Sequence, residues 1–124
     1  MRRFAIMAVA LTATGCGIVG KVCTLEARFS VIAQARDSRT GGQLGAPPTG
    51  TITDGPYRET MNVYLGRDGA YRLTAGEERR GTYDVEIRAE GYRPWRQTGV
   101  EVKHDGCHVV TAELDVGMVP LASP

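Results

Sequence analysis

The sequence predicts an all-β protein, a sandwich of about seven short strands. Three observations carry this prediction. Apolar and polar residues alternate with a period of two in several segments, which is typical of half-buried strands. The 16 glycines and 6 prolines among 124 residues favour turns over long helices. Turn-forming residues recur every 8 to 14 positions, at Gly41-Gly42, Asp54-Gly55-Pro56, Asp68-Gly69, Gly76, Gly81, Gly91 and Asp105-Gly106.

The first expected strand covers residues 26–37. Its alternation predicts an apolar face and a polar face, formed by Phe29, Val31, Ala33 and Ala35 and by Arg28, Ser30, Gln34 and Arg36 respectively. A turn-rich stretch follows, in which Pro47 and Pro48 exclude a helix. Further strands are expected at 49–54, 57–66, 69–75, 81–92, 94–106 and 107–116.

The clearest alternation lies in residues 81–92, "GTYDVEIRAEGY". The pattern places one set of side chains in the core, namely Tyr83, Val85, Ile87 and Ala89. The segment "TAGEERRG" contains helix formers, but so few residues between glycines favour a turn. No helix is expected after the N-terminal segment.

Length and charge limit the functions to consider. The chain has room for one domain of about 100 residues once terminal segments are removed. The net charge is +1, and without Arg2 and Arg3 there are 13 basic against 14 acidic residues. A nucleic-acid-binding protein needs a concentrated basic face, so no nucleic acid partner is expected.

The N-terminus predicts a signal peptide over residues 1–15. Arg2 and Arg3 precede an apolar run from Phe4 to Leu11, and small residues follow before Cys16. The run of about ten residues is too short for a helix to cross a bilayer, which takes roughly 20. The alternative is a buried N-terminal helix.

Ala13-Thr14-Gly15-Cys16 resembles a bacterial lipobox, in which small residues precede a cysteine that is diacylated and becomes the new N-terminus. The usual leucine three residues before the cysteine is replaced here by Ala13. The resemblance implies lipidation of Cys16 and contact with a lipid bilayer, with residues 16–23 as a tether. Cleavage by an ordinary signal peptidase, giving a soluble product, is the alternative.

We therefore expect the chain in a bacterial cell envelope. Gly17, in place of an aspartate after the cysteine, resembles the outer-membrane sorting signal of bacteria with two membranes, which implies an outer-membrane anchor facing the periplasm. Two cysteines of a small exported domain usually form a disulfide. Lipidation of Cys16 leaves Cys23 and Cys107, which we therefore expect to pair. By loop entropy, such a bridge contributes up to roughly 4.5 kcal/mol.

Most of residues 24–119 resemble the carboxypeptidase regulatory-like, or transthyretin-like, module. The resemblance lies in Gly81-x-Tyr83 with its alternating apolar residues, in Gly91-Tyr92, and in Asp37-Ser38-Arg39-Thr40-Gly41 after the first strand. It implies a seven-stranded Greek-key β-sandwich with a cysteine entering the first strand and another starting the last, followed by a tail at 120–124. This module is not itself a peptidase.

His104, Cys107 and His108 form the one cluster in the sequence with metal-ligand chemistry. Zinc needs at least three ligands, and a Cys107 oxidised in a disulfide is not one. A disulfide beside two surface histidines is the preferred interpretation, with no metal and no cofactor. Catalysis is not expected either, because the chain has no Gly-x-Ser-x-Gly and its serines have no recognisable partners.

The corner "GYRPWRQTG" places Tyr92, Arg93, Trp95 and Arg96 within five residues. Aromatic and arginine side chains are frequent interface anchors, which makes these four residues a candidate surface for a protein or glycan partner. The alternative is that Tyr92 and Trp95 close one end of the sandwich while the arginines are solvated.

The sequence therefore predicts a non-enzymatic, lipid-anchored β-sandwich of the cell envelope, either structural or binding a protein or glycan. Two alternatives remain open. One is a soluble secreted carrier of a small ligand, which needs an apolar groove. The other is a metal-binding protein that uses His104, Cys107 and His108.

Overall fold

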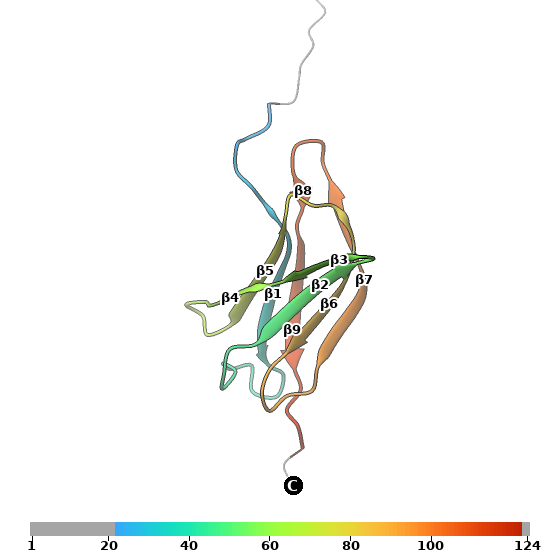
Figure 1. Cartoon of the computed structure of the whole chain (residues 1–124). Helices are drawn as coiled ribbons and strands as arrows, with labels where there is room; N and C mark the ends of the chain where they lie inside the picture. The colour runs from blue at the N-terminus through green and yellow to red at the C-terminus, as the bar shows by residue number, and fades with distance from the viewer. Residues whose placement is uncertain (1–21, 123–124) are drawn as a thin grey trace, which may run out of the picture.

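The computed structural model describes residues 22–122 and is all-β in that range (Figure 1). It has no helix there, and hence none long and apolar enough to cross a bilayer. Nine strands follow one another along the described chain: β1 Phe29–Asp37, β2 Thr49–Asp54, β3 Tyr57–Thr60, β4 Asn62–Leu65, β5 Tyr71–Glu77, β6 Gly81–Arg88, β7 Trp95–His104, β8 Val109–Val110 and β9 Ala112–Met118. The expected signal peptide and Cys16 lie outside the described residues.

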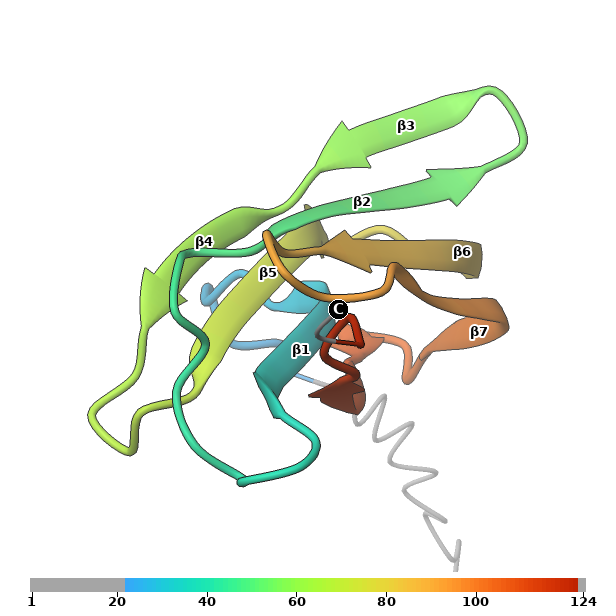
Figure 2. The same cartoon turned by 90° about the horizontal axis from the view of Figure 1, so that it is seen from below.

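The strands form a four-stranded sheet, in the order β4-β5-β1-β9, and a five-stranded sheet, in the order β3-β2-β6-β7-β8. The two sheets face each other in a β-sandwich-like arrangement, seen along its length in Figure 2. Both contribute to one apolar core: Val31, Ala33 and Leu73 come from the four-stranded sheet, and Ile52 and Val85 from the five-stranded sheet. This shared core is why neither sheet is stable without the other.

The strand at 81–92 has the predicted alternation. Tyr83, Val85 and Ile87 are fully buried in β6, and the residues between them point away from the core. The first strand follows its pattern only in part. Phe29, predicted to be inside, is exposed, and Ser30, predicted to be outside, is buried.

Ser30 can be buried because its hydroxyl is fully satisfied. Oγ donates to the Arg79 carbonyl oxygen at 2.5 Å and accepts from the Arg79 backbone N–H at 3.2 Å. Its Cβ lies where a side chain at Gly76 would stand, and Gly76 has a positive φ of 74°. Ser30 therefore packs against the bare backbone of β5, a contact that strand alternation does not reveal.

Nine strands replace the seven that were predicted because two predicted strands change sheets midway. Residues 57–66 split into β3 and β4 at Met61, whose side chain is buried between the sheets. Residues 107–116 split into β8 and β9 at Thr111, whose hydroxyl donates to the Phe29 carbonyl oxygen at 2.7 Å. At each point a single residue carries the chain from one sheet to the other.

The pair β1–β9 is parallel, whereas every other strand pair is antiparallel. The first and last long strands therefore run side by side in the same direction. As a result, the described chain enters at one end of the sandwich and leaves at the other (Figure 1). The tip of the β7–β8 hairpin lies at the end where the chain enters.

Candidate functional site

The N-terminal segment, residues 22–28, is held against the tip of the β7–β8 hairpin. A disulfide joins Cys23 to Cys107, with Cα atoms 5.2 Å apart. The hairpin tip is shaped by Asp105, whose Oδ1 accepts from the backbone N–H groups of Cys107 and His108 at 2.8 Å each. The predicted disulfide is thus present, and it fixes the point at which the chain enters the sandwich.

His108 provides a second attachment for the same segment. Its Nε2 lies 2.9 Å from Thr24 Oγ1, and its Nδ1 lies 2.5 Å from Glu78 Oε1. The residue is only 6% exposed, so the expectation of a surface histidine was wrong for His108. His104 is exposed as expected, and its Nδ1 accepts from the Gly106 N–H at 2.9 Å.

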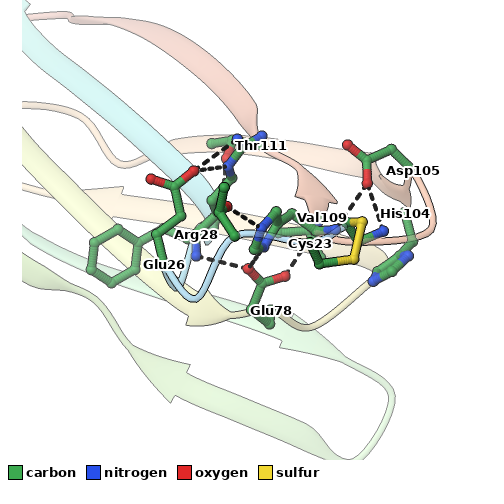
Figure 3. A network of polar contacts seen from close by, with 12 residues as sticks. Cys23, Glu26, Arg28, Glu78, His104, Asp105, Val109 and Thr111 are labelled. Atoms are coloured by element: carbon green, nitrogen blue, oxygen red, sulfur yellow. Dashed lines mark hydrogen bonds and ion pairs between the residues drawn. A yellow bond between two sulfur atoms is a disulfide. The ribbon is translucent and has the colours of Figure 1, made fainter. Parts of the chain in front are cut away.

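Glu78 is the centre of this network (Figure 3). Its Oε1 accepts from the Arg28 N–H at 3.0 Å as well as from His108, and its Oε2 accepts from the Val109 N–H at 3.0 Å. Desolvation raises the pKa of Glu78, but hydrogen bonds from His108, Val109 and Arg28 outweigh it and leave that pKa below its ordinary value. An ionised carboxylate only accepts hydrogen bonds, so His108 Nδ1 carries a proton that it donates to Glu78, while Nε2 makes the contact with Thr24.

Glu78 also has a strained backbone. Its φ is +50°, and among the described residues it alone combines a positive φ with a side chain. Such a conformation costs of order 1 kcal/mol in general and is retained where surrounding contacts compensate. Its own N–H donates to the Arg28 carbonyl oxygen at 2.9 Å, so backbone and carboxylate both bind Arg28. We call these contacts, with the disulfide, the N-terminal clamp: Cys23, Thr24, Arg28, Glu78, Cys107 and His108.

The order hydroxyl, imidazole, carboxylate in Thr24, His108 and Glu78 has the connectivity of a nucleophile, its base and an orienting acid. The furrow described below does not include Thr24. Every one of these contacts joins segments far apart in the sequence. We therefore interpret the network as an attachment of the N-terminal segment.

The metal-binding alternative loses two of its three candidate ligands. Cys107 is oxidised, and both ring nitrogens of His108 have protein partners. Within residues 22–122, no group of three or more His, Cys, Asp or Glu side chains is placed to hold a metal ion.

The four expected partner-binding residues do not form one patch. Trp95 lies opposite Ile87 across the β6–β7 pair and packs against the core, while the next residue, Arg96, lies opposite Glu86 on the outer face and pairs with it. Successive residues of a strand point to opposite faces, which separates these two side chains. Arg93 is exposed at the corner.

Tyr92, the fourth of these residues, closes the end of the sandwich opposite the N-terminal clamp. Its ring packs against the core, and its hydroxyl donates to Asp37 Oδ2 at 2.8 Å. Asp37 Oδ1 accepts from the N–H groups of Arg39 and Thr40, which forms the predicted turn. The Tyr92 hydroxyl, followed by these backbone N–H groups, lowers the pKa of Asp37 despite its burial. Tyr92 thus fits the alternative in which this corner closes the sandwich.

A shallow pocket lies on the outer face of the five-stranded sheet. This furrow has a volume of about 370 Å³, and its lining is largely threonine and charged side chains: Thr51, Thr53, Arg58, Asp84, Val85, Glu86, Arg88, Arg96, Gln97 and Thr98. Glu86 is paired with Arg88 and Arg96. Arg58 and Asp84, on either side of Thr53, have no ion-pair partner among the described residues.

Sequence reasoning missed the furrow. The outward positions of β2 and β6 are polar, which by itself indicates a solvated face. The hollow arises because short threonines on β2 lie between the long arginines of β3 and β6, and that requires the strand order. Arg58 and Asp84 pair with Thr53 from its two sides, so their backbones lie two strand spacings apart, about 10 Å, with Thr53 between them.

No protein-family model matches the chain, and no curated protein matches it either.

Proposed function

We propose that this chain is a non-enzymatic, lipid-anchored β-sandwich of the bacterial cell envelope, held in the membrane by a diacylated Cys16. The observation that carries the proposal is the Cys23–Cys107 disulfide at the entry of the chain. Structural disulfides persist in oxidising compartments and are rare in the cytosol, which supports export. The bridge also accounts for two of the three cysteines and leaves Cys16 for the lipid.

The N-terminal clamp suits a protein attached through its N-terminus. A force on a tether at residues 16–23 reaches the fold first at Cys23, where a covalent bond transfers it to the β7–β8 hairpin. Beyond the bridge, Thr24 and Arg28 are bound by His108 and Glu78. Unzipping of β1 from its N-terminal end is thereby opposed at three successive points.

For the fold, we propose a Greek-key sandwich of the carboxypeptidase regulatory-like, or transthyretin-like, kind. The two facing sheets and their shared core support this proposal. If β3 with β4, and β8 with β9, are each counted as one strand that changes sheets, the chain has the seven strands of that module.

The furrow is our proposed contact surface for an envelope protein or glycan. It contains Arg96, one of the four residues expected to bind a partner, together with Arg58 and Asp84, which form no ion pair within residues 22–122. Unpaired donors and acceptors on a hollow surface offer hydrogen bonds that a partner can satisfy without first breaking an ion pair. A soluble carrier of an apolar ligand is less well supported, because the larger described pocket is mostly polar.

Peptide masses, measured without reduction on protein extracted from its native membrane, test the anchor. We expect a diacylated peptide beginning at Cys16 and a Cys23-Cys107 linked peptide. An unmodified Cys16 contradicts the lipid anchor and favours the soluble alternative.

Cross-linking in cells tests the contact surface. The double variant Arg58→Gln/Asp84→Asn should lower the yield of partner cross-links, whereas Arg67→Gln, an exposed arginine of the β4–β5 turn, should leave it unchanged. Equal yields from all three proteins would remove the furrow from the proposal.

A further inference from the structure

The clamped end of the sandwich exposes apolar side chains that its own fold does not cover. Val22 and Leu25, both in the N-terminal segment, are 95% and 106% exposed. Phe29 and Val110 at the same end are 40% and 53% exposed, and the Thr111 hydroxyl bonded to the Phe29 carbonyl oxygen keeps the two strands together. Isolated exposed apolar residues are common on protein surfaces. Here several gather at one end of the domain, and the fully exposed side chains of Val22 and Leu25 add nothing to the core.

The contacts of the N-terminal clamp hold this part of the segment in place. Cys23 and Thr24 lie between Val22 and Leu25, and both are bonded to the hairpin tip. Thr24, the residue before Leu25, is bonded to His108, and Arg28, three residues after it, is bonded to Glu78, so the stretch that carries Leu25 is attached on both sides. A disulfide and a buried histidine thus hold in place a segment whose apolar side chains are exposed.

The short stretch of chain between Cys16 and the clamped end indicates which surface covers the exposed apolar side chains. Val22 is six residues and Leu25 nine residues from Cys16, so a lipid on Cys16 keeps them within about 20 and 30 Å of its attachment point even when the chain is fully extended. The opposite end of the sandwich lies a further nine-residue strand away, about 30 Å. Of the two ends, only the clamped end is therefore always within reach of the headgroups.

We propose that the clamped end of the domain rests on the bilayer, with Leu25 and Val22 inserted at the level of the headgroups and acyl boundary. This inference rests on the proposed lipid anchor and goes beyond it, since it assigns an orientation. Apolar side chains at that depth add to a covalent lipid as a second membrane contact. The Tyr92 end then points away from the membrane, and the furrow lies along the side of the domain, open to partners.

Photo-leucine, a photoreactive and nearly isosteric leucine, tests the proposal in the full chain without any mutation. Cells that express the protein with photo-leucine are irradiated, and lipid adducts are located in the peptides by mass spectrometry. Leu25 is compared with Leu65 and Leu121, which are 49% and 56% exposed on other parts of the domain, and with the buried Leu44 and Leu73. We expect at least about five-fold more lipid adduct on Leu25 than on Leu121.

The same digest separates the two proposals. A diacylated Cys16 with no excess of adduct on Leu25 overturns the membrane contact and leaves the anchor intact. An unacylated Cys16 removes the tether on which the orientation depends and overturns both. Enrichment on Leu121 instead of Leu25 reverses the proposed orientation and contradicts it directly.

Discussion

Glu78 Oε1 lies 2.5 Å from Nδ1 of the buried His108, although Glu78 lies at the β5–β6 corner and His108, 30 positions later, just before β8. The same carboxylate accepts backbone N–H groups from Arg28 and Val109. One side chain thus joins the N-terminal segment, the β5–β6 corner and the last hairpin. The stability of the clamped end should depend on it more than on any other single carboxylate there.

Glu78→Gln should lower the melting temperature by about 5–10 °C, because an amide oxygen cannot replace both carboxylate oxygens as acceptors for three donors. Thermal unfolding followed by circular dichroism measures the change. Glu77→Gln is the matched control, since Glu77 is exposed and adjacent, and it should melt like the wild type. Equal melting temperatures for both variants would show that the network adds no stability.

The positive φ of Glu78 gives a second comparison at the same position. Glu78→Gly and Glu78→Ala both lose the carboxylate, but only glycine adopts a φ of +50° without strain. The glycine variant should therefore melt a few degrees above the alanine variant. The reverse order would mean that residue 78 leaves the left-handed region in the alanine variant. The contacts of the Glu78 carboxylate, and not the surrounding fold, would then be what holds the positive φ.

Tyr92→Phe should destabilise the protein at neutral pH and much less in acid. The Tyr92 hydroxyl holds the pKa of Asp37 below its ordinary value of 3.8, so the ionised carboxylate contributes stability that is present above that value. This contribution is lost as the pH falls through the lowered pKa. Melting temperatures of the wild type and the variant should differ from pH 5 to pH 7 and converge as the pH falls below 3.8 and through the lowered pKa of Asp37.

Tyr64→Phe serves as the control for this experiment, because Tyr64 is 55% exposed on the edge strand β4. Its difference from the wild type should be small and independent of pH. A gap between wild type and Tyr92→Phe that stays constant down to the lowest pH would show that the hydroxyl stabilises the fold by packing and not through the Asp37 carboxylate.

The sequence predicted the parts of the fold that depend on local pattern. The alternation of Tyr83, Val85 and Ile87 determines which face of β6 is buried, and the Cys23–Cys107 pair follows from the cysteine count once export and lipidation of Cys16 are assumed. A strand that changes sheets keeps the same alternation on both sides of the change. The crossings at Met61 and Thr111 therefore left no local signal, and two strands were missed.

The candidate site was less predictable, because its members meet through long-range contacts. His108 is buried only because Glu78 and Thr24 reach it from 30 and 84 residues away, and the turn "GEERRG" gives no sign that Glu78 is left-handed. For Tyr92 and Trp95 the sequence left two interpretations open, a partner surface and closure of one end of the sandwich, and both side chains pack against the core as the second has it. Sequence alone did not separate Trp95 from Arg96, which point to opposite faces because they are neighbours on one strand.

Gly50→Ala should test how tightly the sheets pack at the Met61 crossing. A Cβ on Gly50 would stand 2.7 Å from Met61 Sδ and 2.8 Å from Leu73 Cδ2, closer than packed atoms approach. Overpacking of this kind costs about 1–3 kcal/mol in free energy of unfolding. Urea denaturation measures it, with Gly45→Ala as control, because a Cβ there meets nothing within 4 Å. A neutral Gly50→Ala would mean that Met61 moves aside and that the crossing is loosely packed.

Removal of the disulfide should have the largest effect of all. The double variant Cys23→Ser/Cys107→Ser frees a loop of 84 residues in the unfolded chain, and the loop-entropy relation predicts a loss of up to about 4.5 kcal/mol. A domain of this size has only about 5–15 kcal/mol in total, so the variant should unfold at much lower urea concentration. Adding a reductant to the wild type should reproduce the shift, and adding it to the variant should change nothing. A wild type that is insensitive to reductant, with its thiols shown to be free, would mean that the hydrogen bonds of Glu78 and His108 hold the N-terminal segment without the bridge.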